Sequence, residues 1–206
     1  FNDQDISDWT IINGSWTAEN RFLEQLLTAN HRKALSSHSI TDPSIVEAKL
    51  NYMSTYPYSS NAIFFSNNSW GDEGYRFCFG ALTGGGTWID KIYGTLAYDT
   101  TMNYSNYGFT WLKAKITYDG VGNFSFLLRA PDSVQVLLKV YDITYSPPFI
   151  LGNYVGSHTG IDDLRVRKFT DPEPSTSIGE EQINDVIVIE PDYYDSTGTG
   201  QTKTYS

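Results

Sequence analysis

The stretch Val46-Glu47-Ala48-Lys49-Leu50-Asn51-Tyr52 decides the fold class. Its apolar and polar side chains alternate strictly, and an alternation of period two is typical of a β-strand with one buried face and one wet face. The same pattern returns in Leu112–Tyr118 and in Tyr75–Phe79, where Arg76 and Cys78 take the second face. These segments predict antiparallel strands that each turn one side toward a shared core.

Further strands are expected where β-branched and aromatic residues run between turn signals. They are Asn61–Ser66, Thr87–Tyr93, Asn123–Arg129, Val134–Tyr141, Phe149–Val155 and Leu164–Phe169. Glycine and proline clusters such as Gly84-Gly85-Gly86 separate them. Phe22–Leu35 alone has helical spacing, and a pair of strands explains it equally well. The pattern predicts an all-β, two-sheet antiparallel β-sandwich.

The chain of 206 residues is long enough for one such sandwich and too short for two. After Thr170 the sequence changes to Asp-Pro-Glu-Pro-Ser-Thr-Ser, which is typical of a stiff polar linker. We therefore expect a domain at 1–170 and an acidic linker and tail at 171–206. The tail contains a β-branched run that predicts one further strand at 183–189, with Ile183, Val186, Ile187, Val188 and Ile189 as its apolar residues.

The formal net charge is −10, from 24 acidic and 14 basic residues. Eight of the acidic residues and one of the basic ones follow Thr170, so the tail carries −7 and the body −3. Nucleic-acid binding depends on lysine and arginine side chains that release counterions. An acidic body without a basic stripe in its sequence therefore argues against a nucleic-acid partner.

Several features indicate an extracellular or cell-surface protein of microbial origin. Cys78 is the single cysteine, so neither an internal disulfide nor a cysteine-based metal site is expected. Four Asn-x-Ser sequons predict glycosylation of an exported protein, at Asn13, Asn67, Asn103 and Asn123. No apolar run is long enough for a membrane span. The chain begins at Phe1, so we expect a mature product or a fragment of a longer protein.

The opening segment, Ser7–Asn20, contains Ser-Asp-Trp-Thr-Ile-Ile-Asn-Gly-Ser-Trp and resembles the first hairpin of many concanavalin A-like lectin/glucanase domains. Ile161–Phe169, followed by Thr-Asp-Pro-Glu-Pro, resembles their closing strand, the partner of that hairpin. Together the two ends are similar to the lectin-like modules of archaeal and bacterial surface proteins, over residues 1 to 170. The resemblance implies a jelly roll of two curved sheets, often with a glycan-binding concave face or loop edge, and in some members a structural calcium near the joined chain ends.

This superfamily contains lectins, hydrolases, adhesion modules and structural domains, so the fold does not choose the function. Glycoside hydrolases need paired carboxylates flanking the scissile bond. The body contains no Glu-x-Asp-x-x-Glu, and the nearest sequence, Glu190–Asp195, ends in aspartate, contains Pro191 and lies in the tail. We therefore expect no enzymatic activity.

Exposed aromatic rings provide platforms for sugars, and nearby polar groups fix the hydroxyls. The candidate glycan-binding residues are Trp70, Trp88, Asp72, Tyr93 and Tyr98, with Tyr104 and Tyr107 as extensions. Trp70 lies in a turn rich in glycine and asparagine, and Trp88 follows three glycines. The alternative is that these rings pack under loops or cover a sheet edge. Trp9, Trp16 and Trp111 are expected in strands and in the core.

Carboxylates gather at the two ends of the domain and predict oxygen ligands for calcium. The candidate ligands are Asp3, Asp162 and Asp163, with Asn2 and Asp5 beside them. The alternative is that they are ordinary surface acids, since their spacing is not that of a defined calcium loop. The three histidines lack zinc-site spacing.

Two functions follow from these observations. The first is a non-catalytic glycan-binding or adhesion module whose partner is a polysaccharide or cell-surface glycan. The second is a structural subunit of an extracellular filament, in which strand 183–189 joins the sheet of another copy of the chain.

Overall fold

The computed structural model describes residues 7–18, 22–26, 32–53, 60–80, 85–91, 94–156 and 158–170. The chain divides into the units Phe1–Glu173 and Pro174–Ser206, and every described residue belongs to the first. The expected strand at 183–189 lies outside the described residues and stays a prediction.

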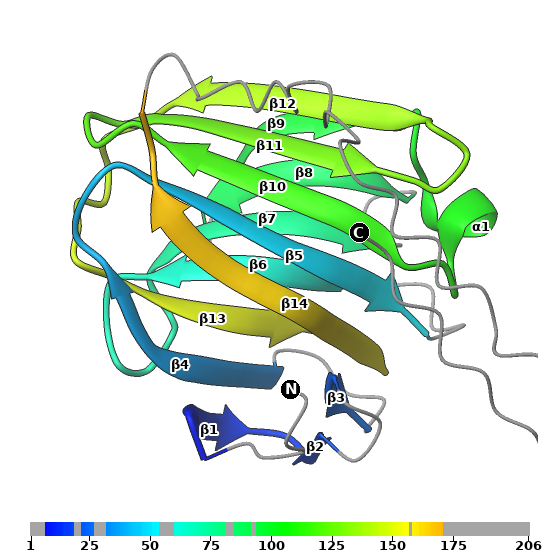
Figure 1. Ribbon diagram of the computed structural model, residues 1–206, viewed down its shortest axis with the longest axis horizontal. Coiled ribbons are helices and arrows are strands. Elements are labelled where there is room, and N and C mark those ends of the chain that lie inside the picture. Colours follow the sequence, from blue (N-terminus) through cyan, green and yellow to red (C-terminus); the bar gives the residue numbers. More distant parts are fainter. Residues whose placement is uncertain are drawn as a thin grey trace, which may run out of the picture. The chain divides into compact units, whose positions relative to one another are not determined.

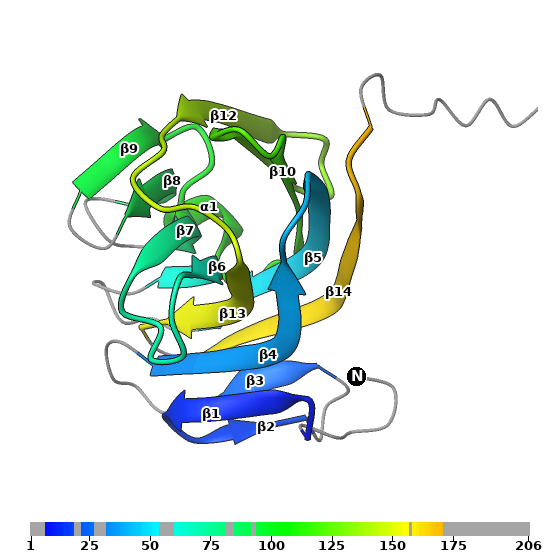
Figure 2. The same ribbon diagram turned by 90° about the vertical axis from the view of Figure 1, so that its left-hand side faces the viewer.

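The described residues form two antiparallel sheets of seven strands each, which lie as two layers in Figures 1 and 2. Sheet A has the order β1 (Trp9–Asn13), β4 (Arg32–Ile40), β13 (Phe149–Val155), β6 (Ser60–Ser66), β7 (Gly74–Gly80), β8 (Gly86–Lys91), β9 (Gly94–Asp99). Sheet B has the order β12 (Gln135–Tyr141), β11 (Asn123–Arg129), β10 (Leu112–Tyr118), β5 (Ser44–Tyr52), β14 (Thr159–Lys168), β3 (Leu23–Gln25), β2 (Trp16–Thr17). A short helix, α1 (Tyr104–Tyr107), precedes β10. The predicted all-β sandwich is confirmed.

The alternation that predicted β5 and β10 sets their register. Leu50 pairs with Leu112, and Val46 pairs with Ile116; all four side chains are buried. Lys49 lies opposite Lys113 on the other face of the sheet. Each strand therefore turns an apolar side to the core and a charged side outward, as its sequence predicts.

The high aromatic content is explained by the core between the sheets. Phe124 of sheet B lies at its centre, with its ring centroid 4.6 Å from Tyr75 and 5.9 Å from Phe77, both of sheet A. Tyr118 stacks on the same ring at 4.9 Å. Trp9 belongs to this core, whereas Trp111 is half-buried just before β10 and meets Phe22 edge-on.

Buried amides also join the two sheets. The Asn61 side chain in sheet A donates to the carbonyls of Asn51 and Gly160 in sheet B, at 3.0 and 2.8 Å. Asn153 donates in turn to the side-chain oxygen of Asn61 at 2.8 Å. Hydrogen bonds of this kind satisfy groups that would otherwise be costly to bury.

The opening segment is not the predicted hairpin. β1 pairs with β4 in sheet A, whereas β2 pairs with β3 in sheet B, so the chain crosses between sheets at Gly14. Gly14 has φ +108°, a backbone conformation that glycine adopts without strain. The closing strand β14 pairs with β3 and β5 rather than with the opening segment.

The ambiguous segment Phe22–Leu35 resolves in favour of strands. Its described parts are β3 and the start of β4, but these lie in different sheets and are not a hairpin pair. Leu23 packs in the core and pairs with Ile161 of β14, so tertiary pairing overrides the helical spacing of this segment.

Candidate functional site

The outer face of sheet A, here called face A, carries a second apolar cluster outside the main core. Cross-strand partners share a face of a sheet, so the pairing register assembles it. One row across the sheet consists of Lys33, Tyr154, Ala62, Cys78, Trp88 and Tyr98. The next row contains Leu35, Gly152, Phe64, Arg76 and Asp90. Six members of these rows pack together and are buried, unlike an ordinary wet sheet face. They are Leu35, Ala62, Phe64, Cys78, Trp88 and Tyr154.

A bidentate ion pair lies in the middle of face A. The Arg76 guanidinium meets the Asp90 carboxylate through Nε at 2.7 Å and Nη2 at 2.8 Å. The indole Nε1 of Trp88 donates to the second Asp90 oxygen at 3.0 Å. Burial raises the pKa of Asp90, although the hydrogen bonds from Arg76 and Trp88 oppose that shift. Burial disfavours the charge on Arg76, but its neighbours, Asp90 included, hold the pKa above its ordinary value, so Arg76 stays charged.

Two cations lie over the Tyr154 ring. The Arg76 guanidinium is 4.7 Å from the ring centroid, and the Lys33 ammonium is 5.7 Å from it. Burial lowers the pKa of Lys33, against the attraction of Asp72. The result is a layer of alternating rings and charges that runs from β4 to β8.

The connection between β6 and β7, Asn67–Glu73, folds back over this face. The Asn68 side chain holds it, because its Oδ1 accepts from the Trp70 N–H at 3.1 Å and its Nδ2 donates to Asp72 at 2.6 Å. Gly71 has φ +63°, and a Cβ there would lie 3.3 Å from the Phe64 ring. The Lys33 ammonium donates to the Trp70 carbonyl at 3.4 Å. The loop is therefore anchored on both sides of Trp70.

The structure separates the predicted glycan-binding residues. The Trp70 side chain is 70% exposed, as a loop-tip platform requires. Trp88 is only 2% exposed, so the prediction that it forms an exposed platform is wrong. The reason is that Trp88 lies within β8 on face A, where it packs in the second apolar cluster and binds Asp90.

The remaining residues that were predicted to bind glycan lie in different environments. Asp72 is exposed in the anchored loop, beside Trp70. Tyr98 is 40% exposed at the β9 end of face A, and its hydroxyl donates to the Gly85 carbonyl. Tyr107 donates to Asp132 near the helix α1, away from the loop. Tyr93 and the side chain of Tyr104 lie outside the described residues.

Asp162 and Asp163 share a lysine. Lys49 lies 2.5 Å from Asp163 and 3.9 Å from Asp162, and hydrogen bonding to Lys49 lowers the pKa of Asp163. Within the ranges that the structure describes, no group of three or more candidate ligands comes together for a metal ion. Asp3 lies outside those ranges, as do Asn2 and Asp5. The two aspartates that are described thus have a cationic partner from the protein itself, and calcium stays a prediction.

The four sequons differ in how the asparagine is used. Glycans attach to the side-chain nitrogen, and that atom donates to the Ser146 carbonyl in Asn67 and to Asp119 in Asn123. Asn13 and Asn103 instead use their side-chain oxygen, as acceptors from backbone N–H groups. Glycosylation stays a prediction at all four.

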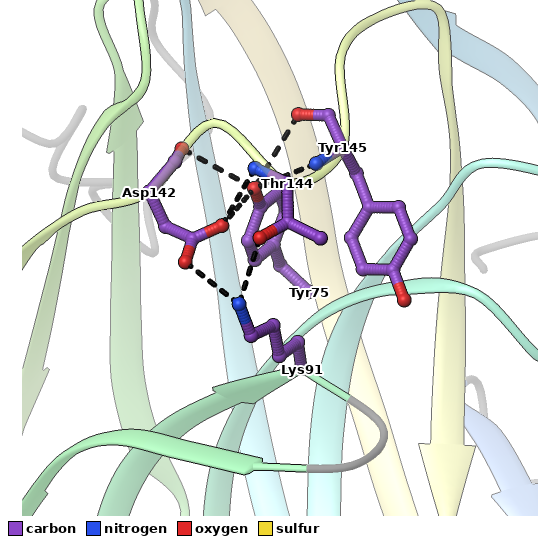
Figure 3. A network of polar contacts seen from close by, with 5 residues as sticks. All are labelled: Tyr75, Lys91, Asp142, Thr144 and Tyr145. Atoms are coloured by element: carbon purple, nitrogen blue, oxygen red, sulfur yellow. Dashed lines mark hydrogen bonds and ion pairs between the residues drawn. The ribbon is translucent and has the colours of Figure 1, made fainter.

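A second polar network surrounds Tyr75, the neighbour of Arg76 in β7, and is shown in Figure 3. The Tyr75 hydroxyl donates to Asp142 at 2.7 Å and accepts from the Tyr145 N–H at 3.1 Å. Lys91 donates to Asp142 at 3.0 Å and to Thr144 at 2.7 Å. Burial raises the pKa of Tyr75. The network joins the segment after β12 to sheet A.

We expect Asp142→Asn to lower the free energy of unfolding by about 2 kcal/mol at neutral pH, because charge-assisted hydrogen bonds are lost. Burial opposes the charge on Asp142, but hydrogen bonds from Thr144, Tyr75 and Lys91 hold its pKa below the ordinary value. A carboxyl with a depressed pKa stabilises the folded state above its unfolded pKa, and this contribution is lost as the pH falls toward the folded pKa. Urea unfolding should show the wild-type advantage at pH 7 and a smaller one near pH 3. An equal difference at both pH values would contradict this.

Sequence reasoning missed most of face A. No sequence motif marks its polar and aromatic residues, which are Lys33, Asn68, Asp90 and Tyr154. Only the alternation in β7 placed Arg76 on the side away from the core.

In the described residues, no helix is long and apolar enough to cross a membrane.

No protein-family model matches the sequence, and no curated protein matches it. Solved structures do resemble it. The carbohydrate-binding module CBM66 from Bacillus subtilis has a TM-score of 0.65 at 16% identity, over 80% of this chain and 98% of that one. Lectin I-B4 from Griffonia simplicifolia has a TM-score of 0.62 at 15% identity, over 79% of this chain and 94% of the lectin.

A GH43 protein from Bacillus licheniformis is also similar, with a TM-score of 0.58 at 11% identity, over 81% of this chain but only 38% of the longer protein. At these identities the likeness concerns the fold alone. Lectins, a carbohydrate-binding module and part of a glycoside hydrolase family protein thus share one arrangement of strands with this chain. The chain shares a two-sheet jelly-roll fold with these structures, which is the fold that its resemblance to concanavalin A-like lectin/glucanase domains predicted.

Proposed function

We propose that this domain is a non-catalytic glycan-binding module, and that Trp70 is the platform on which a sugar ring stacks. The observation that carries the proposal is a large apolar ring, 70% exposed, at the tip of a loop whose backbone is anchored by Asn68 and Lys33. A loop backbone held in place before binding loses little conformational freedom when a ligand arrives, so more of the contact energy contributes to affinity.

The polar groups around Trp70 suit a sugar. A pyranose presents C–H groups on its faces and hydroxyls at its rim, so it needs a flat ring and adjacent donors and acceptors. Asp72 supplies an exposed carboxylate acceptor, and the Lys33 ammonium supplies a donor close to the Trp70 carbonyl. Carbohydrate-binding proteins among the structural neighbours support this assignment.

The proposed absence of catalysis is supported by the hydrogen bonds of Asp90, the carboxylate in the middle of face A. A glycosidase needs an acid and a second carboxylate free to act as nucleophile or base. Both oxygens of Asp90 are bound by Arg76 and Trp88, which leaves Asp90 unsuited to either task.

We further propose an extracellular, cell-surface setting, which the four sequons and the single cysteine support.

We expect Trp70→Ala to weaken binding to the recognised polysaccharide at least tenfold, which corresponds to about 1.4 kcal/mol. Affinity electrophoresis through gels that contain a panel of neutral soluble polysaccharides measures the effect. Tyr141→Ala is the matched control, because this ring is 66% exposed but lies on β12 of sheet B. Its binding should equal that of the wild type. Unchanged retention of Trp70→Ala, or no retention of the wild type on any polysaccharide, would remove the proposal.

The second candidate function is a filament subunit that donates its tail strand to another copy. β12 is an edge strand of sheet B with seven residues and exposed Leu137 and Tyr141. Edge strands offer backbone groups to which a further strand can pair. The discriminating observation is whether residues 183–189 of one copy pair with β12 of another.

A further inference from the structure

The outer face of sheet B, here called face B, gathers basic side chains that are scattered along the sequence. The alternation in β5, β10, β11, β12 and β14 turns seven of the chain's 14 lysines and arginines to this face. They are Lys49, Lys113, Lys115, Arg129, Lys139, Arg165 and Arg167. On the same strands, Glu47, Asp162 and Asp163 are the acidic residues of the face. Face B therefore carries an excess of positive charge in a chain whose net charge is −10.

A groove of about 430 Å³ runs across this face. Five cations line it: Lys49, Lys113, Lys115, Arg129 and Arg165. Two carboxylates, Glu47 and Asp163, line it as well, and none of the described residues that line it is aromatic. The register places Lys49 opposite Lys113 and Lys113 opposite Arg129, so three cations on adjacent strands form one row.

The ion pairs on face B leave part of this charge unbalanced. Asp163 pairs with Lys49 and lies 3.9 Å from Arg165, while Glu47 lies 3.6 Å from Arg167. Arg129 donates to the neutral side chain of Gln135 at 3.0 Å. Among the described residues, no carboxylate forms an ion pair with Lys113 or Arg129. These two cations are therefore available to an anionic ligand.

We propose that the groove on face B binds an acidic polysaccharide with hexuronate residues, separately from the Trp70 site. Adjacent strands are about 4.8 Å apart, so the backbone positions that carry these three side chains repeat at about that interval. Successive carboxylates of a linked uronate chain are separated by a distance of the same order. Arginine side chains bind carboxylates through paired hydrogen bonds, and lysines add charge without a fixed direction.

The two carboxylates in the groove favour a sugar over a nucleic acid. A uronate residue offers hydroxyl donors beside its own carboxylate, so Glu47 and Asp163 have groups to accept from. A DNA backbone offers phosphates without hydroxyls, and a groove without aromatic residues offers its bases no ring for stacking. The sequence-based premise that no basic stripe exists is wrong, because strand pairing assembles the stripe from four segments. Its chemistry still disfavours single-stranded DNA as the ligand.

The test compares polygalacturonate with its fully methyl-esterified form, which keeps the backbone and removes the charge. Wild-type protein should bind polygalacturonate at low salt at least tenfold more tightly than the ester, with an affinity that falls as salt rises. Lys113→Gln/Arg129→Gln should lose at least tenfold of that affinity. Lys139→Gln/Lys168→Gln removes the same charge at exposed positions that do not line the groove and should stay within twofold of the wild type.

Trp70→Ala separates this proposal from the function assigned to face A, since it should leave polygalacturonate binding unchanged. Equal binding of the acid and its ester would overturn the groove as a uronate site. So would equal losses in the two double variants, or tighter binding of single-stranded DNA than of polygalacturonate. Isothermal titration calorimetry on the full chain provides all of these affinities.

Discussion

Asp90→Ala is expected to lower the free energy of unfolding by about 3–5 kcal/mol, because it leaves a charged guanidinium buried without its partner. Arg76 has only 13% of its side chain exposed, and Asp90 provides two of its hydrogen bonds. The variant also removes the acceptor of the Trp88 indole N–H. Urea denaturation followed by tryptophan fluorescence measures the loss.

A double variant, Arg76→Met/Asp90→Leu, distinguishes the charge from the packing. Buried ion pairs are often replaced by apolar residues of similar size with little cost. The double variant should therefore recover most of the stability that Asp90→Ala loses. A loss below about 1 kcal/mol in Asp90→Ala would instead match the small worth of a solvated surface pair, and would mean that water reaches Arg76.

Phe124→Ala is expected to cost about 3–5 kcal/mol, the range for a large ring removed from a packed core. Phe124 is buried between the sheets and contacts rings from both of them. Its loss therefore opens a cavity that neighbouring strands cannot easily fill. The measurement is thermal or urea unfolding.

Phe109→Ala provides the comparison, because this ring is 61% exposed near α1. Substitutions at exposed sites usually change stability by less than about 0.5 kcal/mol. Similar losses in Phe124→Ala and Phe109→Ala would contradict the assignment of Phe124 to the shared core.

The fold class could be predicted because apolar and polar residues alternate within each strand, and this alternation can be recognised in the sequence of one strand alone. Leu112–Tyr118, Asn123–Arg129 and Phe149–Val155 have the bounds that their sequences predict. What could not be predicted was which strands pair. β1 and β2 are separated by two residues and yet lie in different sheets, because a glycine backbone allows a sharp turn. Periodicity defines the faces of a strand but carries no information about its neighbours.

The candidate site was predicted only in part for the same reason. Trp70 and Trp88 both follow turn-forming residues, so from the sequence alone both rings are expected to be exposed at loops. Trp88 is buried because Cys78, Tyr154 and other side chains brought by pairing cover face A. The Arg76–Asp90 pair likewise depends on the register of β7 against β8. The basic row on face B arises from the same kind of register and stays hidden in the sequence.

The thiol of Cys78 can report on local opening of sheet A. It is the chain's single cysteine and lies buried on face A, where burial raises the pKa of its thiol. Alkylating reagents attack the thiolate, so Cys78 reacts only when the strands around it open and expose the thiol to water. The rate at which Cys78 is labelled therefore measures how often the strands of sheet A open locally. A ligand that binds at Trp70 and stabilises sheet A should slow this labelling, so no engineered probe is needed.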